Sequence, residues 1–253
     1  MRRTLLPLAL CLLLAAPPLS AQETEVPLPR ERPLPEAVEP APADEADPAD
    51  ADAAEQAGAA DAAPEVPPRD YQVACPALLQ GQVVAETLPP IAEGQCRLAS
   101  PLALTALTAN GRQVPLSAPV VTDCGMATLL PDWVAEIDRH VAAREDTRIA
   151  EVLSGTAYAC RNVNNARAGN LSFHAFGAAV DITGFVLEDG RRISVLEDWD
   201  DTAAGSRTIR FAHEAACARF TTVLGPEADA LHRDHLHLDL GCHGRRCTAR
   251  ICE

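Results

Sequence analysis

Eight of the nine cysteines in this 253-residue chain lie between residues 75 and 252. An even number of cysteines in an exported chain indicates disulfide bonds, which restrict the folds open to the chain. Spacing alone does not give the pairing, although we expect Cys75 and Cys96 to form a local pair. The spacing of Cys242, Cys247 and Cys252 fits no common zinc module, so disulfides are favoured there over a second metal site.

The N-terminus has the features of a cleaved secretory signal peptide. Two arginines precede an apolar run over residues 5–16, and residues 19–21 (Leu-Ser-Ala) offer a small-residue cleavage site. The apolar run is short for a bilayer-spanning helix, and two prolines follow it. We therefore expect removal of residues 1–21, a periplasmic or secreted location, and no stable membrane anchor after cleavage.

A second N-terminal segment, residues 22–69, is rich in Pro, Ala, Glu and Asp and contains no aromatic residue. It has 13 acidic residues and 3 arginines, a balance of −10 in a chain whose net charge is −15. Such a segment cannot bury enough apolar surface to offset the conformational entropy that the chain would lose on folding. We therefore expect a disordered acidic linker. The residues after 69 are also acidic, with 23 carboxylates against 16 arginines, which disfavours nucleic-acid binding.

The remaining residues, 70–253, are expected to form one folded domain. Short apolar runs separated by Pro and Gly over residues 75–121 indicate short β segments, with a hairpin turn at Asn110-Gly111. Asp189-Gly190 predicts a second hairpin turn. Further predicted strands cover residues 148–153, 178–186, 191–196 and 235–240.

Two helices are predicted in this domain. The first covers residues 126–143, where Trp133, Ile137 and Val141 recur every four residues and would share one buried face. The second covers residues 208–224 and would be ended by Gly225-Pro226. Helices mixed with hairpins, without regular βαβ units, predict an α+β fold with a small antiparallel sheet and flanking helices.

One ten-residue stretch, residues 172–181 (SFHAFGAAVD), places a histidine and a carboxylate seven positions apart. Asp181 falls on a predicted strand, where the sheet would fix its direction, and Gly177 keeps the backbone between Asp181 and His174 uncrowded. Ser172 can bond to the backbone of this loop. A structural His–Asp pair is the alternative to a metal site for these two residues alone.

A histidine-rich stretch lies near the C-terminus, with four of the seven histidines between residues 232 and 243. Because side chains alternate along a strand, His235, His237 and Asp239 are expected to share one face. Two imidazoles and a carboxylate are a donor set of catalytic zinc sites, which leave the fourth position to water. A solvent-exposed polar turn is the alternative, but together with residues 172–181 a metal site is favoured.

The two stretches together resemble the zinc peptidases of bacterial cell walls. These are the D-Ala-D-Ala carboxypeptidases and dipeptidases, the L-Ala-D-Glu endopeptidases and the penicillin-insensitive murein endopeptidases. The H-x-x-H-x-H spacing of residues 232–237 is similar to the last group, and Asp234-x-x-His237 is similar to the others. The resemblance implies that Asp234 or His235 is the catalytic base. It implies three Zn²⁺ ligands: His174, Asp181 and His237.

In those peptidases an arginine follows a Ser-Gly-Tyr stretch upstream of the first histidine and binds the substrate or the developing oxyanion. Here Ser154-Gly155, Tyr158 and Arg161 occur in the same order but further apart. The resemblance therefore implies a catalytic role for Arg161, with an ordinary surface arginine as the alternative. Asp239 is expected to orient a ligand histidine without binding the metal itself.

A closer resemblance, from about residue 71 to the C-terminus, is to the extensin-like C-terminal domain of exported bacterial proteins. It implies a zinc-peptidase-like core, here held by disulfides. The matching stretches are residues 158–162, 172–185, 189–196, 225–226 and 234–239.

Together these features predict an exported zinc-dependent peptidase that acts on the peptide cross-links or stems of peptidoglycan. Zinc would lower the pKa of water and polarise the scissile carbonyl, Asp234 or His235 would transfer the proton, and Arg161 would stabilise the oxyanion. The first alternative is a non-catalytic wall- or partner-binding domain that retains a structural metal. The second is a disulfide-stabilised structural protein without a metal.

Overall fold

The computed structural model describes residues 72–253. The predicted signal peptide, residues 1–21, and the predicted linker, residues 22–69, lie outside the described residues. The helices are α1 (Pro76–Leu79), α2 (Cys124–Glu145), η1 (Val163–Asn165), η2 (Phe173–Phe176), α3 (Val195–Asp198) and α4 (Ser206–Cys217). The strands are β1 (Val83–Thr87), β2 (Ile91–Glu93), β3 (Cys96–Leu98), β4 (Leu102–Ala109), β5 (Arg112–Thr122), β6 (Ile149–Ser154), β7 (Ala179–Leu187), β8 (Arg192–Ser194), β9 (Thr222–Leu224), β10 (Leu236–Asp239) and β11 (Ile251–Cys252).

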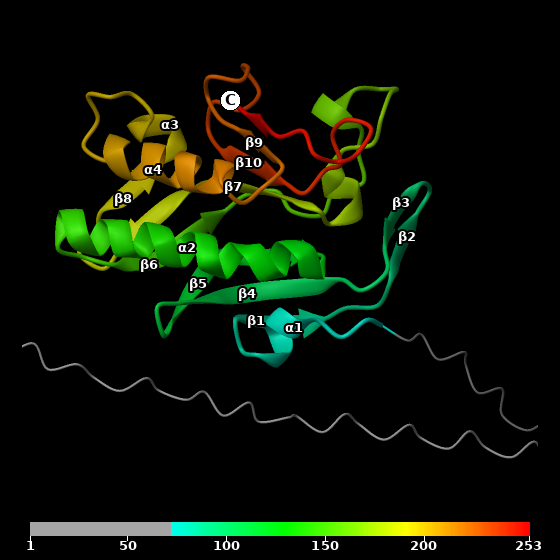
Figure 1. Ribbon diagram of the computed structural model, residues 1–253, viewed down its shortest axis with the longest axis horizontal. Helices are drawn as coiled ribbons and strands as arrows, with labels where there is room; N and C mark the ends of the chain where they lie inside the picture. Colours follow the sequence, from blue (N-terminus) through cyan, green and yellow to red (C-terminus); the bar gives the residue numbers. More distant parts are fainter. Residues whose placement is uncertain (1–71) are drawn as a thin grey trace, which may run out of the picture. The chain divides into compact units, whose positions relative to one another are not determined.

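Nine of these strands form one sheet in the order β1-β4-β5-β6-β7-β10-β9-β11, with β8 paired to β7 (Figure 1). The β5–β6 and β9–β11 pairs are parallel, and β2 and β3 form a separate hairpin. The α+β class is confirmed, but the sheet is mixed and larger than the predicted small antiparallel sheet. The long helix α2 connects β5 to β6, and such a crossover allows parallel pairing that a tight turn does not.

Two hairpin turns lie where the sequence predicts them. Asn110 and Gly111 have φ angles of 49° and 76° between the antiparallel strands β4 and β5, as a type I′ turn requires. Gly190, with φ 86°, lies between the antiparallel strands β7 and β8. The predicted strand 191–196 is shorter in the structure, because the Ser194 side chain accepts a hydrogen bond from the Glu197 amide and begins α3.

Helix α2 carries the predicted buried stripe. Trp133, Ile137 and Val141 are fully buried, and the Trp133 ring lies 5.9 Å from the Phe185 ring of β7. The indole Nε1 donates a hydrogen bond of 2.9 Å to the Ala212 carbonyl of α4. Figure 1 accordingly shows α2 running along the strands with α4 beside it. This layer of two helices covers one side of the core and keeps β7 in place.

The second predicted helix is wrong at its C-terminal end. Helix α4 stops at Cys217, and Thr222–Leu224, expected to be helical, forms strand β9 between β10 and β11. The Thr221 amide donates to the Asp239 carbonyl, so pairing with a distant strand decides the conformation here. Local helix propensity is a weak preference that such tertiary pairing overrides.

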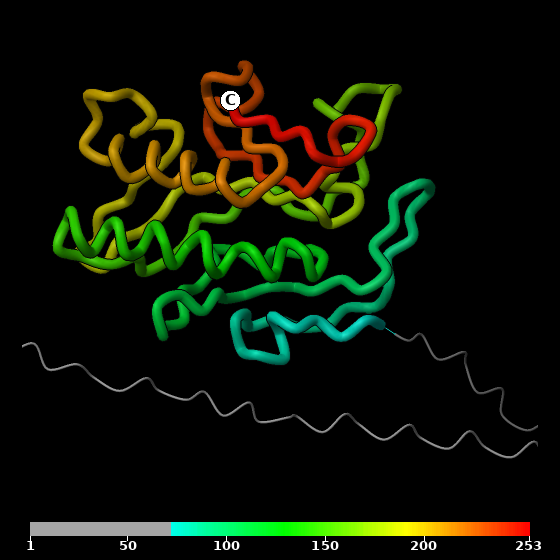
Figure 2. Tube along the Cα trace, viewed as in Figure 1, coloured from blue at the N-terminus to red at the C-terminus, as the bar shows by residue number. Residues whose placement is uncertain are grey.

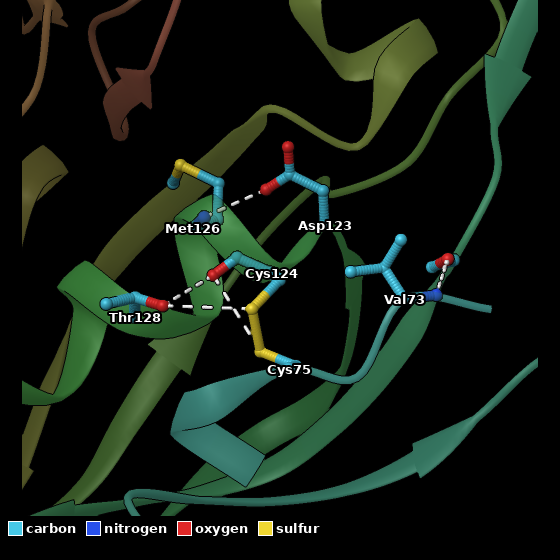
Figure 3. Close-up of a disulfide and its surroundings, with 7 residues drawn as sticks. Val73, Cys75, Asp123, Cys124, Met126 and Thr128 are labelled. Atoms are coloured by element: carbon cyan, nitrogen blue, oxygen red, sulfur yellow. Dashed lines mark hydrogen bonds between the residues drawn. A yellow bond between two sulfur atoms is a disulfide. The ribbon is translucent and has the colours of Figure 1, made fainter. Parts of the chain in front are cut away.

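Four disulfides connect the described residues, as the even cysteine count predicts. The predicted Cys75–Cys96 pair is wrong, because Cys75 at the start of α1 lies beside the first residue of α2, as Figure 3 shows. At that helix start, the Asp123 carboxylate accepts a hydrogen bond of 2.9 Å from the Met126 amide (Figure 3). The pairs are Cys75–Cys124, Cys96–Cys160, Cys217–Cys252 and Cys242–Cys247.

Disulfides therefore take up all of the C-terminal cysteines that a second metal site would have needed.

Over residues 72–253, no helix combines the length and the apolar character needed to cross a membrane.

A buried carboxylate joins α2 to β6 and to the β4–β5 turn. Asp138 accepts hydrogen bonds of 2.9 Å from Arg148 Nε, 2.8 Å from Asn110 Nδ2 and 3.1 Å from the Ile149 amide. Burial acts to raise the pKa of Asp138, but the Arg148 and Asn110 bonds outweigh it and lower the pKa. The ionised carboxylate is thus a structural element of the domain.

Replacing Asp138 with alanine is expected to lower the free energy of unfolding by about 3 kcal/mol near neutral pH, because Arg148 loses its buried partner. A carboxylate with a lowered folded pKa stabilises above its unfolded value of about 4 and loses this contribution as the pH falls through the folded pKa. Urea denaturation at neutral and acidic pH should show the gap between parent and variant closing in acid. Asp132→Ala, an exposed change on the same helix, should stay within about 0.5 kcal/mol. An equal Asp138→Ala deficit at both pH values would contradict a charge-based role.

Candidate metal centre

Two of the three predicted metal ligands face each other across neighbouring strands. Asp181 on β7 pairs directly with His237 on β10, so their side chains leave the sheet on the same face. His237 Nδ1 lies 3.0 Å from Asp181 Oδ1, and both residues are buried. The strand register therefore brings together residues that are 56 positions apart in the sequence.

The third predicted ligand, His174, comes from the short helix η2. Ser172 caps this helix by accepting a hydrogen bond from the His174 amide, and Gly177 ends it with φ 64°. A Cβ atom at Gly177 would lie 2.6 Å from the Leu98 side chain, so both the backbone angle and the space favour glycine. The cap and the glycine turn point the fully buried His174 ring at Asp181 and His237.

The tautomer of His174 follows from its surroundings. Its Nδ1 lies 2.6 Å from the Ala157 carbonyl oxygen, and because a carbonyl can only accept, Nδ1 must carry the proton. In the neutral ring Nε2 then bears the lone pair. This atom lies 3.1 Å from His237 Nδ1 and 3.3 Å from Asp181 Oδ1.

The other ring nitrogen of His237, Nε2, also has a fixed partner. His237 Nε2 lies 3.1 Å from Asp239 Oδ2, and the other Asp239 oxygen accepts a hydrogen bond of 2.8 Å from the Gly241 amide. Burial acts to lower the pKa of His237, but the bonds to Asp181 and Asp239 raise it to about 9. Burial likewise acts to raise the pKa of Asp181, yet His174 and His237 hold that pKa well below its usual range.

These contacts allow a test of whether a zinc ion fits. With both imidazoles neutral and the His237 proton on Nε2 toward Asp239, three lone-pair atoms converge at mutual distances of 3.0–3.3 Å, an arrangement that a cation between them would stabilise. Tetrahedral zinc with bonds of about 2.0–2.1 Å would separate neighbouring ligand atoms by about 3.3 Å. The three donors also lie within 4.8 Å of one another in a buried site. The donor set His174, Asp181 and His237 therefore suits zinc in type, tautomer and spacing.

The two candidate bases occupy different positions. His235 Nδ1 lies 2.8 Å from Asp234 Oδ1, while His235 Nε2 lies 3.6 Å from Asp181 Oδ1. The Asp234 side chain is 65% exposed and the His235 side chain 19%. His235 therefore lies between Asp234 and the predicted ligands, and Asp234 orients its ring.

Two cavities of about 220 Å³ and 430 Å³ flank this centre. The larger one reaches Asp181, and the smaller one reaches His237. Arg161, the predicted oxyanion ligand, lines both cavities, which places it close enough to the centre to contact a bound molecule. Four residues line both cavities: Arg161, Asn164, His232 and His235.

The comparisons with known proteins agree with the extent of this domain. The family described as "Extensin-like protein C-terminus" matches residues 73–253. The chain belongs to this family. Neither a curated protein nor a solved structure matches the chain. The extensin-like domain thus contains every element from α1 to β11 and the whole candidate centre.

Some residues of the extensin-like site were not singled out from the sequence. The Ala157 carbonyl fixes the His174 tautomer, yet a backbone oxygen leaves no trace in residue type. Asn164 and Asn165 both have positive φ angles, 55° and 54°, and line the larger cavity. Their Asn-Asn pattern indicates a turn, which could have suggested a loop of fixed shape.

A second group of metal-type side chains in the extensin-like domain is His213, Cys217 and Cys252. Cys217 and Cys252 are disulfide-bonded to each other, so their sulfurs are not thiolate donors. Among the described residues, the buried group of His174, Asp181 and His237 is therefore the better candidate for a metal.

Proposed function

We propose that the extensin-like domain is an exported zinc-dependent peptidase that acts on peptide stems or cross-links of peptidoglycan. The observation that carries the proposal is the convergence of His174 Nε2, His237 Nδ1 and Asp181 Oδ1 beside a histidine with a free ring nitrogen. Four disulfides support an oxidising compartment outside the cytoplasm. The resemblance of these motifs to cell-wall peptidases supports the substrate class.

His174, Asp181 and His237 would hold the ion, which when bound supplies Lewis-acid polarisation of a carbonyl and lowers the pKa of water. His235 Nε2 is placed to accept a proton from the attacking water and to return it to the leaving amine. Asp234 keeps the proton of His235 on Nδ1, which leaves Nε2 free to act as the base.

Arg161 contributes positive charge from the cavity side of the centre. Its backbone carbonyl accepts a hydrogen bond of 3.0 Å from the Ser172 amide, which ties the Arg161 loop to the loop that carries His174. The guanidinium can therefore stabilise the oxyanion that develops on a scissile carbonyl bound between the two cavities. Space on both sides of His235 leaves room for peptide groups before and after the scissile bond.

The test is digestion of purified muropeptides and intact sacculi by zinc-loaded mature protein, residues 22–253, with its disulfides formed. Mass spectrometry of the products identifies the bond cleaved. His235→Gln should keep its zinc and lose about a hundredfold or more in rate, because it lacks the proton acceptor. His140→Gln, a change on α2 beside Phe211, should retain the parent rate.

One outcome would contradict the peptidase, and another would reassign its base. Zinc-loaded parent that releases no product from any muropeptide would leave the metal-containing binding domain as the better function. Full activity in His235→Gln would remove His235 from the mechanism and return the base to Asp234.

A further inference from the structure

Positive charge is unevenly distributed over the described domain. Residues 72–253 contain 16 arginines and 22 acidic residues, so the domain is acidic as a whole. Two segments, 152–180 and 240–252, contain five of the arginines and no acidic residue. These segments are therefore cationic parts of an acidic domain.

Both segments line the candidate centre. The cavity of about 220 Å³ is lined by Arg161 and Val163 from the first segment and by His243 and Ile251 from the second. Figure 2 shows the C-terminal chain in red passing beside the green chain of the first segment. The two segments lie close together, because residues of both line the same cavity. The cationic segments thus meet at this cavity beside the candidate centre.

The C-terminal segment holds its arginines in a short closed loop. Cys242 is bonded to Cys247, and His243 forms a bridge with Ala249, so residues 243–249 make a tight turn beside the cavity. Arg245 and Arg246 lie within this turn and are exposed. The backbone of a cross-linked turn loses little further entropy when the turn binds a ligand.

These arginines are not neutralised within the described part of the chain. The ion pairs between residues 72 and 253 use other arginines. No carboxylate of this part of the chain lies within 4.0 Å of an arginine in either segment. We call four of them the arginine rim: Arg161, which lines both cavities, and Arg167, Arg245 and Arg246, which lie in the same two segments as other residues that line the smaller cavity.

We propose that the arginine rim binds carboxylate groups of a peptide, so that the site takes acidic peptides in preference to neutral ones. This inference names the substrate class of the proposed peptidase and rests on that proposed function. Cationic side chains around a cavity concentrate the field and attract anionic ligands. The acidic remainder of the domain repels a long polyanion, and Phe173 is the single Phe, Tyr or Trp side chain lining the two cavities. Nucleic acid, which needs an extended basic groove with stacking aromatics, therefore fits less well than a short peptide with carboxylates.

The test measures binding rather than cleavage. Two fluorescent peptides of the same sequence are compared, one with free carboxylates and one with every carboxylate amidated, by anisotropy with zinc-loaded mature protein. The parent should bind the acidic peptide about fivefold to tenfold more tightly, since a few partly exposed ion pairs contribute about 1 kcal/mol together. High salt should reduce this preference.

Variants show whether the rim is responsible. Arg245→Gln/Arg246→Gln should lose most of the preference while leaving the amidated peptide unaffected. The matched control is Arg144→Gln/Arg207→Gln, which removes the same charge from exposed positions on α2 and α4. It should keep the preference of the parent.

Equal binding of the two peptides by the parent, or an equal loss in the control variant, would overturn the arginine rim. Hydrolysis of both peptides without any binding preference would do the same while leaving the peptidase intact. A binding preference without hydrolysis would retain the rim and contradict the peptidase.

Discussion

Alanine at His174 or at His237 is expected to abolish stoichiometric zinc binding by residues 22–253 of the protein. Each imidazole supplies one of three converging donors, and Asp181 supplies the third. Zinc-binding free energies of about 10–16 kcal/mol shared among four ligands imply a loss of about a hundredfold to a thousandfold for each ligand removed. Metal content by mass spectrometry after dialysis against zinc, and titration calorimetry for affinity, measure the effect.

Asp239, which contacts His237 Nε2, allows a milder change at the same site. Asp239→Asn weakens the bond that orients the His237 ring without removing a donor. Loss of such a partner costs about tenfold to a hundredfold in metal affinity. The expected order of affinity is therefore parent, then Asp239→Asn, then the two alanine variants.

Controls and contrary outcomes for the zinc prediction are direct. His140→Ala removes an imidazole stacked on Phe211 and should retain about one zinc per chain. Full zinc in His174→Ala would show that the assigned ligands are wrong. Parent protein without zinc after dialysis would contradict the peptidase and favour a metal-free structural or binding domain.

The proximity of the three candidate ligands was predictable because each residue type carries a specific chemistry. His174, Asp181 and His237 stood out through spacing and through resemblance, and the structure brings all three together. What the spacing could not supply is the β7–β10 register, which alone decides that Asp181 faces His237. The metal-binding role of these residues stays a prediction.

Long-range pairings explain the parts of the fold that were missed. Cys75–Cys124 and Cys96–Cys160 join residues 49 and 64 positions apart, and proximity in sequence favours neither pair. Thr222–Leu224 is strand because β10 and β11 flank it, although its own sequence is compatible with a helix. Local signals did predict the Asn110-Gly111 turn and the face of α2, where the decisive contacts or backbone angles follow from adjacent residues.

Removing the Cys96–Cys160 disulfide with a double alanine substitution is expected to lower the free energy of unfolding by about 4 kcal/mol. The bridge closes a span of 64 residues, and most of its effect comes from restricting the unfolded chain. It also ties β3 to the residue before Arg161, so its loss should loosen the loop that carries this arginine. Urea denaturation measures the stability, and hydrogen exchange at the Ser172 amide, which donates to the Arg161 carbonyl, measures the loop.

The Cys242–Cys247 disulfide is the matched comparison, because it closes a span of only 5 residues. Its double alanine variant should lose about 2 kcal/mol by the same entropy argument, roughly half the loss at the longer loop. It should also leave exchange at the Ser172 amide unchanged. Equal destabilisation by the two variants would contradict the unfolded-state explanation. Unchanged exchange at Ser172 in the Cys96–Cys160 variant would show that the Arg161 loop is held by its other contacts, such as the hydrogen bonds between Arg161 and Ser172 and between Val163 and Asn170.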